Sequence, residues 1–128
     1  MTEYTSLEVS ERLLQARKIA LDNRGHDDMG NCEASHRWYV MPRKQKPRLL
    51  PYSAELGSIT AEAEIAPAYN SGTLLAWLVE SGYGVEIVRD APGDIHACAG
   101  QYPATAPTLP DALAEVAMKV LAGGQDAI

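Results

Sequence analysis

Two histidines and a cysteine offer the side chains that zinc prefers as ligands. These residues are His26, Cys32 and His36, and they lie in and beside the polar loop that we expect from Gly25 to Ser35. The Cys32-x-x-x-His36 spacing allows a thiolate and an imidazole to reach one ion. A structural zinc site needs four ligands, however, and the Cys-x-x-Cys pair that usually supplies two of them is missing. We therefore favour a polar surface loop and keep a metal site as the alternative.

Asp94, His96 and Cys98 occupy alternate positions of one predicted strand, so their side chains project from the same face. A thiol beside an imidazole and a carboxylate suggests a cysteine nucleophile. Side chains two positions apart on a strand are about 7 Å from each other, whereas direct proton transfer needs about 3 Å. We therefore predict that this face is a solvent-exposed binding surface that includes His96, and that the protein is not an enzyme. The opposite face has the composition of a core face and comprises Ile95, Ala97 and Ala99.

A cluster of cations without any acid lies between residues 37 and 48. Its members are Arg37, Arg43, Lys44, Lys46 and Arg48. Trp38 lies within this cluster, and an aromatic ring next to cations can stack on a base while the cations neutralise a phosphate. Tyr69, at the edge of a predicted helix, adds a second ring with a hydroxyl group. Together with His96, these residues are our candidate ligand-binding residues. The alternative is a solvated loop with Trp38 at the core.

The first element that we predict is a helix over about residues 6–22. Thr5 and Glu8 have the spacing of a capping box, and apolar residues follow at helical intervals. Asn23 and Gly25 suit the C-terminal end of this helix.

Short strands are expected in the middle of the chain. β-favouring residues predict a strand at Arg37–Met41, and three prolines make Pro42–Gly57 irregular. Apolar and polar residues alternate from Ile59 to Ile65, which predicts a half-buried strand there, and a helix is the alternative because Ala and Glu prefer helix.

A second helix is predicted over about Ser71–Ser81. Asn70 or Ser71 can cap its N-terminus, and Gly82 suits the left-handed position after its C-terminus. Apolar residues run without a break around Trp77, so we expect this helix to be the central buried one, with Trp77 in the core.

A hairpin and a final helix complete the predicted elements. The strands Val85–Asp90 and Asp94–Ala99 flank Ala91-Pro92-Gly93, a favourable turn sequence. Thr108 gives the start signal of the last helix, and Gly123-Gly124 ends it. Its apolar stripe comprises Leu109, Ala112, Leu113, Val116, Ala117, Val120 and Leu121, and its predicted solvent side comprises Asp111, Glu115 and Lys119.

These elements predict the α+β class in a single domain spanning residues 1–128. The expected architecture is a layered helix/sheet/helix sandwich with a largely antiparallel sheet. Residues 36–65 form its irregular, basic segment with short strands. Residues 67–122 form the best-defined unit, a helix, hairpin and helix.

Three stretches of the second half resemble the phage ABA sandwich domain. The run Pro67-Ala68-Tyr69-Asn70-Ser71, followed by Ala76-Trp77, is similar to the Pro-x-Tyr-Ser and Ala-Trp motifs of that family. The hairpin lies where the family has strands, and Thr105-Ala106-Pro107 with Ala117–Leu121 is similar to its closing helix. The chain departs from the family at Asn70-Ser71-Gly72, at Thr108-Leu109-Pro110 and in lacking an Ile-Cys pair. The resemblance implies a layered α/β fold and phage origin, and no catalytic residue.

Charge and the missing motifs narrow the function. The net charge is −6, and Arg89 and Lys119 are the only cations after residue 64, which disfavours nucleic acid as a partner. The sequence has no membrane span, no export signal and no nucleotide-enzyme motif, so we expect a cytoplasmic protein without a cofactor. The two cysteines are expected to stay reduced.

We predict a small phage-encoded binding protein without catalysis, acting in the host cytoplasm as a counter-defence factor. Its partner would be a host defence protein, or a small anionic ligand such as a nucleotide signal. The alternatives are a nucleic-acid-interacting accessory protein and a metal-dependent or cysteine enzyme. A homo-oligomer is also expected, through the last helix or through an exposed strand edge.

Overall fold

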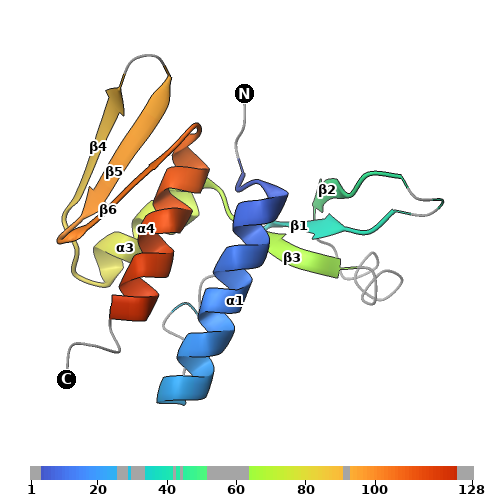
Figure 1. The fold of residues 1–128 in the computed structure, drawn as a ribbon, viewed down its shortest axis with the longest axis horizontal. Helices are drawn as coiled ribbons and strands as arrows, with labels where there is room; N and C mark the ends of the chain where they lie inside the picture. The colour runs from blue at the N-terminus through green and yellow to red at the C-terminus, as the bar shows by residue number, and fades with distance from the viewer. Residues whose placement is uncertain are drawn as a thin grey trace.

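The computed structural model describes residues 4–25, 29, 34–41, 43, 45–51, 64–90 and 93–123. Within them it contains helices and antiparallel strands, so the predicted α+β class is confirmed (Figure 1). The elements are α1 (Leu7–Arg24), β1 (His36–Tyr39), β2 (Arg48–Pro51), β3 (Glu64–Ala68), α3 (Ser71–Glu80), β4 (Val85–Asp90), β5 (Asp94–Ala99), β6 (Tyr102–Ala106) and α4 (Leu109–Gly123).

The strands form two sheets, with the helices α1 and α4 between them. One sheet has the order β4-β5-β6 and the other the order β2-β1-β3. The β4–β6 sheet packs on α4, α4 packs on α1, and α1 packs on β3 of the second sheet (Figure 1). The prediction of a layered sandwich with antiparallel strands is therefore confirmed. The structure adds that the strands are divided between two sheets.

Helix α4 is the most buried helix of the described chain. Nine of its residues are buried, because the β4–β6 sheet covers one side and α1 covers the other. The sequence instead predicts that the helix over residues 71–81 is the central one. That prediction is wrong, since Val79 of α3 is 57% exposed. Trp77 is buried in the core, as predicted.

The β4–β6 sheet contains one predicted hairpin and one strand that the sequence does not reveal. The hairpin strands have the predicted bounds, and Gly93 in the turn has φ 112°. The third strand, β6, escapes prediction because Pro103 interrupts its pattern. The inner face of the sheet consists of Ile95 and four alanines that let α4 approach closely, namely Ala97, Ala99, Ala104 and Ala106.

Helix α1 begins one residue later than its capping-box pattern suggests. Ser6 is the N-cap, and its side chain accepts a hydrogen bond from the Val9 N–H. Thr5 is fully buried and does not cap the helix. The helix ends at Gly25, which has φ 76°, as the sequence predicts.

The β1–β3 sheet projects from the other side of α1 (Figure 1). β1 matches the predicted strand within two residues. β2 contradicts the prediction of an irregular segment, because Pro47 precedes the strand and Pro51 is its last residue, so neither proline interrupts it. β3 shares only its first two residues with the predicted strand Ile59–Ile65, and the residues before Glu64 lie outside the described part of the chain. None of the described helices is both long enough and apolar enough to span a bilayer.

Candidate functional site

A pocket of about 690 Å³ opens where the first turns of α3 and α4 meet the ends of β4 and β5. Its size lies within the range of small-molecule sites, about 300–1,000 Å³. Four separate parts of the chain build it. The lining residues are Tyr4, Asn70, Ser71, Gly72, Arg89, Ile95, Pro107, Thr108, Leu109 and Pro110.

The first turn of α3 forms one wall of the pocket. Asn70 caps the helix, and its side-chain oxygen accepts a hydrogen bond of 2.7 Å from the Thr73 N–H. The first backbone N–H groups of a helix have no acceptor within the helix, and here they belong to Ser71 and Gly72. Both residues line the pocket. This wall therefore offers hydrogen-bond donors and the positive end of a helix dipole.

The first turn of α4 forms the opposite wall. The Thr108 carbonyl accepts a hydrogen bond of 3.0 Å from the Ala112 N–H, which closes the first turn. Pro110 has no N–H, and a proline is tolerated in this turn because its donor would have no helical acceptor. The N–H of Leu109 remains as the donor of this wall. Two helix N-termini thus meet at one pocket.

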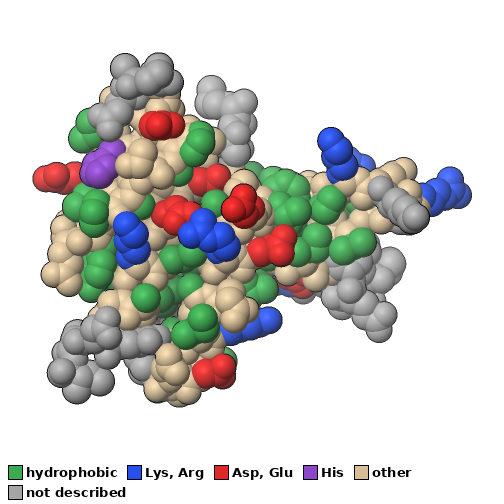
Figure 2. Space-filling model, in the orientation of Figure 1, with side chains coloured by type: hydrophobic (Ala, Val, Ile, Leu, Met, Phe, Trp, Pro, Cys, Tyr) green, Lys and Arg blue, Asp and Glu red, His purple; other side chains and the backbone are tan. Residues whose placement is uncertain are grey.

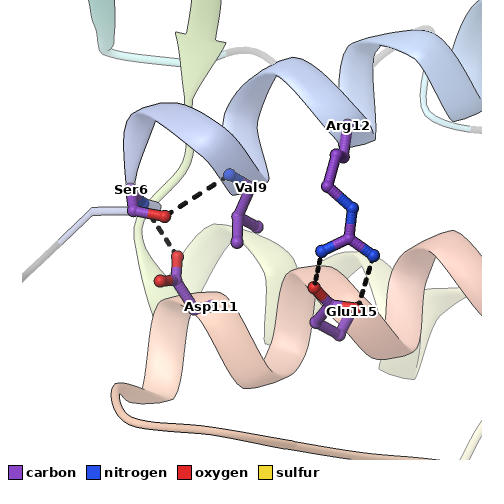
Figure 3. Close-up of polar contacts among 5 residues, drawn as sticks. All are labelled: Ser6, Val9, Arg12, Asp111 and Glu115. Atoms are coloured by element: carbon purple, nitrogen blue, oxygen red, sulfur yellow. Dashed lines mark hydrogen bonds and ion pairs between the residues drawn. The ribbon is translucent and has the colours of Figure 1, made fainter.

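All three helices of the described chain begin at the same end of the molecule (Figure 1). Asp111, in the first turn of α4, accepts a hydrogen bond of 2.8 Å from the Ser6 N–H at the start of α1 (Figure 3). A carboxylate is favourable at a helix N-terminus. Asp111 is 8% exposed and faces α1, which corrects the prediction that it lies on the solvent side of α4. Arg89 supplies the cation of the pocket lining.

Thr5, the residue after the pocket-lining Tyr4, is fixed by several hydrogen bonds. The Thr5 N–H donates to the Tyr69 carbonyl at 2.9 Å, and the Thr5 hydroxyl accepts from the Tyr69 N–H at 3.1 Å. The same hydroxyl lies 2.6 Å from the Ser10 hydroxyl. The Thr5 carbonyl accepts from Trp38 Nε1 at 3.1 Å. One buried threonine therefore joins α1, β1 and the segment between β3 and α3.

The predicted basic cluster lies on a different part of the molecule. Arg37 forms an ion pair of 3.0 Å with Glu64 of β3, within the β1–β3 sheet. Arg43, with φ 61°, and the exposed Lys46 and Arg48 belong to the arm formed by β1, β2 and their connection. Figure 2 shows Lys and Arg side chains at the tip of this arm. Lys44 lies outside the described residues, and none of the other four cations lines the pocket.

The three other candidate ligand-binding residues also lie away from the pocket. Trp38 is half-buried and directed toward Thr5. Tyr69 is buried in the core, where its hydroxyl accepts a hydrogen bond from Arg17. His96 lies on the outer face of the β4–β6 sheet, with Nδ1 3.0 Å from the Thr105 hydroxyl. The predicted division of β5 into a core face and a solvent-facing side is therefore confirmed.

The predicted metal ligands are only partly described. His26 and Cys32 lie outside the described residues. His36 stacks on Tyr4, with ring centroids 4.1 Å apart, and its Nδ1 lies 3.0 Å from the Ser35 hydroxyl. Among the residues that the structure describes, no group of three or more potential ligands is positioned to hold a metal ion. Cys98 is a free thiol.

The sequence predicts the helix caps that line the pocket, but it does not predict the pocket itself. Asn70 and Thr108 are recognisable as helix starts, but no sequence signal shows that the two starts meet. Tyr4 and Arg89 carry no motif at all. They become part of one site only because the β4–β6 sheet and the start of α1 pack against the same helix ends.

Comparison with known proteins gives no relative for this chain. No family model matches it. Neither a curated protein nor a solved structure matches it. The resemblance to the phage ABA sandwich domain therefore stays a prediction from three short stretches of sequence.

Proposed function

We propose that the protein is a non-catalytic binding protein whose pocket takes a small anionic ligand of nucleotide type. The observation that supports this function best is the meeting of two helix N-termini and Arg89 at one cavity of about 690 Å³. Backbone N–H groups and helix dipoles favour phosphate and carboxylate groups. An arginine adds a charged donor with a geometry that matches both kinds of anion.

The remaining lining fits the organic part of such a ligand. Tyr4, Ile95, Leu109 and two prolines give the pocket apolar and aromatic surface. A base can pack against such a surface while its phosphate lies at the helix ends. The chain as a whole carries a net charge of −6, so the attraction for an anion is local to this end of the molecule.

In this proposal the protein sequesters its ligand. A phage-encoded protein that holds a nucleotide signal without converting it would act in the host cytoplasm as a counter-defence factor. Phage origin is the expectation that the three sequence stretches support, and the binding role is supported by the pocket.

Calorimetry with a panel of mononucleotides, cyclic nucleotides and inorganic phosphate tests the proposal. We expect at least one nucleotide to bind, and Arg89→Ala to weaken its binding by about tenfold to a hundredfold, the usual effect of losing a charge-assisted hydrogen bond. Arg48→Ala is the matched control, because it removes an exposed arginine that lies outside the pocket. Equal affinity of the two variants would contradict the proposal, and so would a panel without any binder.

Ser71→Pro is the second variant for this test. Proline is well tolerated at the first helical position, where it removes the N–H of Ser71. We expect weaker binding of the nucleotide together with an unchanged circular dichroism spectrum. Unchanged affinity would remove the α3 N-terminus from the site.

The arm formed by β1 and β2 supports a second candidate function, the binding of an acidic host protein. Val40 is 57% exposed there, next to the cations Arg43, Lys46 and Arg48. An exposed apolar side chain on an arm that also carries cations is suited to meet an acidic partner. Capture of a host protein that is lost on Arg48→Glu and retained on Arg89→Ala would favour this function.

A further inference from the structure

The four edges of the two sheets are protected unequally. A strand edge exposes unpaired N–H and C=O groups, and proteins commonly protect such an edge with proline, lysine or a bulge. β3 contains Pro67, β6 contains Pro103, and β2 follows Pro47 and ends at Pro51. β4 has no proline and pairs with β5 along its whole length without a bulge. β4 is therefore the only edge strand of the described sheets without a proline in or beside it, and its only protection is the charges of Glu86, Arg89 and Asp90.

The edge of β6 shows what protection means in this sheet. Pro103 pairs with Cys98, and its carbonyl accepts a hydrogen bond from Lys119 of α4. A proline has no N–H to offer to another strand. Both polar groups of the backbone at this position are thus withheld from a new partner.

The edge of β4 is different, because its outward backbone groups follow from the hydrogen bonds on its inner side. The Gly84 carbonyl accepts from the Gly100 N–H at 3.3 Å. Hydrogen-bonded pairs alternate along an antiparallel ladder, so Glu86 and Val88 are the next residues bonded to β5. The N–H and C=O groups of Val85, Ile87 and Arg89 therefore face away from the sheet.

Apolar side chains are exposed on both faces of this strand. Ile87 is 43% exposed and Val88 is 52% exposed, on opposite faces of the sheet. Figure 1 shows β4 as the outermost strand of the molecule. A regular edge with exposed apolar side chains and without proline or a bulge can accept another strand when the charges of that strand are complementary.

We propose that β4 binds β4 of a second copy of this chain, as an antiparallel pair about a two-fold axis. Such an axis runs normal to the sheet, so each residue meets a residue from the same face of the partner strand. A register centred on Glu86 or on Arg89 places identical charges opposite each other. A register centred on Val88 places Glu86 opposite the partner's Asp90. Among the registers that pair at least three residues of each strand, only the one centred on Ile87 has no like charges directly opposite each other.

The same register uses every outward backbone group of the strand. Ile87 meets the partner's Ile87, and Val85 meets the partner's Arg89 along its aliphatic stem. Each of these pairs exchanges two backbone hydrogen bonds. The two sheets join into one continuous sheet, and Ile87 and Val88 lose their exposure. The fit of this strand to itself is what favours a second copy over another partner.

Sedimentation of the full chain over a range of concentrations tests the proposal together with a charge variant. We expect a dimer, and we expect Ile87→Lys to raise its dissociation constant by about tenfold or more, because two lysines then face each other. Val79→Lys is the matched control, since it places the same charge at an exposed apolar position of α3. A wild-type monomer at all concentrations, or a dimer that Ile87→Lys leaves intact, would overturn the proposal.

Disulfide trapping tests the register and does not depend on Ile87→Lys folding normally. In the proposed dimer the two Ile87 Cα atoms lie about 5.5 Å apart, which a disulfide can span. The two Glu86 residues are offset diagonally by about 7–8 Å, which it cannot span without movement. Glu86 lies opposite the free thiol Cys98 of the same chain, so both variants are made together with Cys98→Ser. We expect Ile87→Cys to form a covalent dimer under oxidation and Glu86→Cys to react as slowly as Cys98→Ser alone. Faster trapping through Glu86→Cys would overturn the proposal. Ile87 does not line the pocket, so a failed dimer test would leave the proposed nucleotide binding untouched. A failed binding test would likewise leave the proposed dimer untouched.

Discussion

The two sheets of this protein are held by different kinds of contact. The β4–β6 sheet presents a buried, alanine-rich face to α4, and nine residues of that helix are buried in return. The β1–β3 sheet has no buried residue in β2 and contacts α1 mainly through β3. Tyr39, Ala66 and Ala68 are buried in this sheet, and hydrogen bonds of Thr5 with Trp38 and Tyr69 join it to the start of α1. Close packing along a whole helix thus stabilises one region, whereas the other combines a small buried face with a few hydrogen bonds.

Loss of volume in α4 is the change with the largest expected effect. Leu113 is fully buried, and Leu113→Ala should lower the free energy of unfolding by about 3 kcal/mol, from lost burial and the cavity left behind. Leu50→Ala, in the partly exposed β2, should cost less than about 1 kcal/mol. Urea unfolding of both variants measures the contrast between the two regions, and equal costs would contradict it.

The hydrogen bonds of Thr5 come next in expected effect. Thr5→Val keeps the shape of the side chain but leaves the buried Tyr69 N–H without its acceptor, so we expect a loss of about 2 kcal/mol. Thr5→Ser keeps the hydroxyl and serves as the control. Thermal unfolding should separate the two variants clearly. A valine variant as stable as the serine variant would show that packing fixes this junction.

The helix caps beside the pocket give a smaller effect. Asn70→Ala removes the cap of α3 and should cost about 1 kcal/mol. Ser6→Ala should cost less, because its hydrogen bond to the Val9 N–H is 3.4 Å long against 2.7 Å for Asn70. Chemical denaturation measures both, and the opposite order would contradict the geometric argument.

The ion pair between α1 and α4 gives the smallest expected effect. Arg12 contacts Glu115 through both terminal nitrogens of its guanidinium group, Nη1 and Nη2, but the Arg12 side chain is 52% exposed (Figure 3). Arg12→Ala should therefore cost less than about 1 kcal/mol, and the cost should fall at high salt. A double-mutant cycle with Glu115→Ala measures the coupling free energy of the two side chains. A coupling free energy that does not change with salt would contradict the prediction that solvent screens this ion pair.

Local signals account for the elements that the sequence predicts well. The β4–β5 hairpin has the predicted bounds because its turn sequence and its alternation agree. α4 shows the expected apolar stripe because seven residues recur at helical spacing. β2 and β6 are missed because proline inside or beside a strand resembles a loop signal.

Tertiary contacts account for what the sequence does not predict. Asp111 resembles a solvent-facing residue until α1 packs over it. The pocket depends on the meeting of helix starts that are 38 residues apart, Asn70 and Thr108, and periodicity contains no information about that distance. The composition of the basic cluster predicts a ligand-binding site, yet its described members lie on the arm and do not line the pocket.

The pairing of α1 with α4 sets an order for the folding of the newly made chain. The bond between Ser6 and Asp111 joins residues 105 positions apart, so α1 leaves the ribosome well before the helix that covers it. Contacts of such long sequence separation form slowly, and apolar surface stays exposed until they form. Nascent α1, with Leu13 and Ala20 uncovered, is therefore the stretch that a chaperone would meet during synthesis.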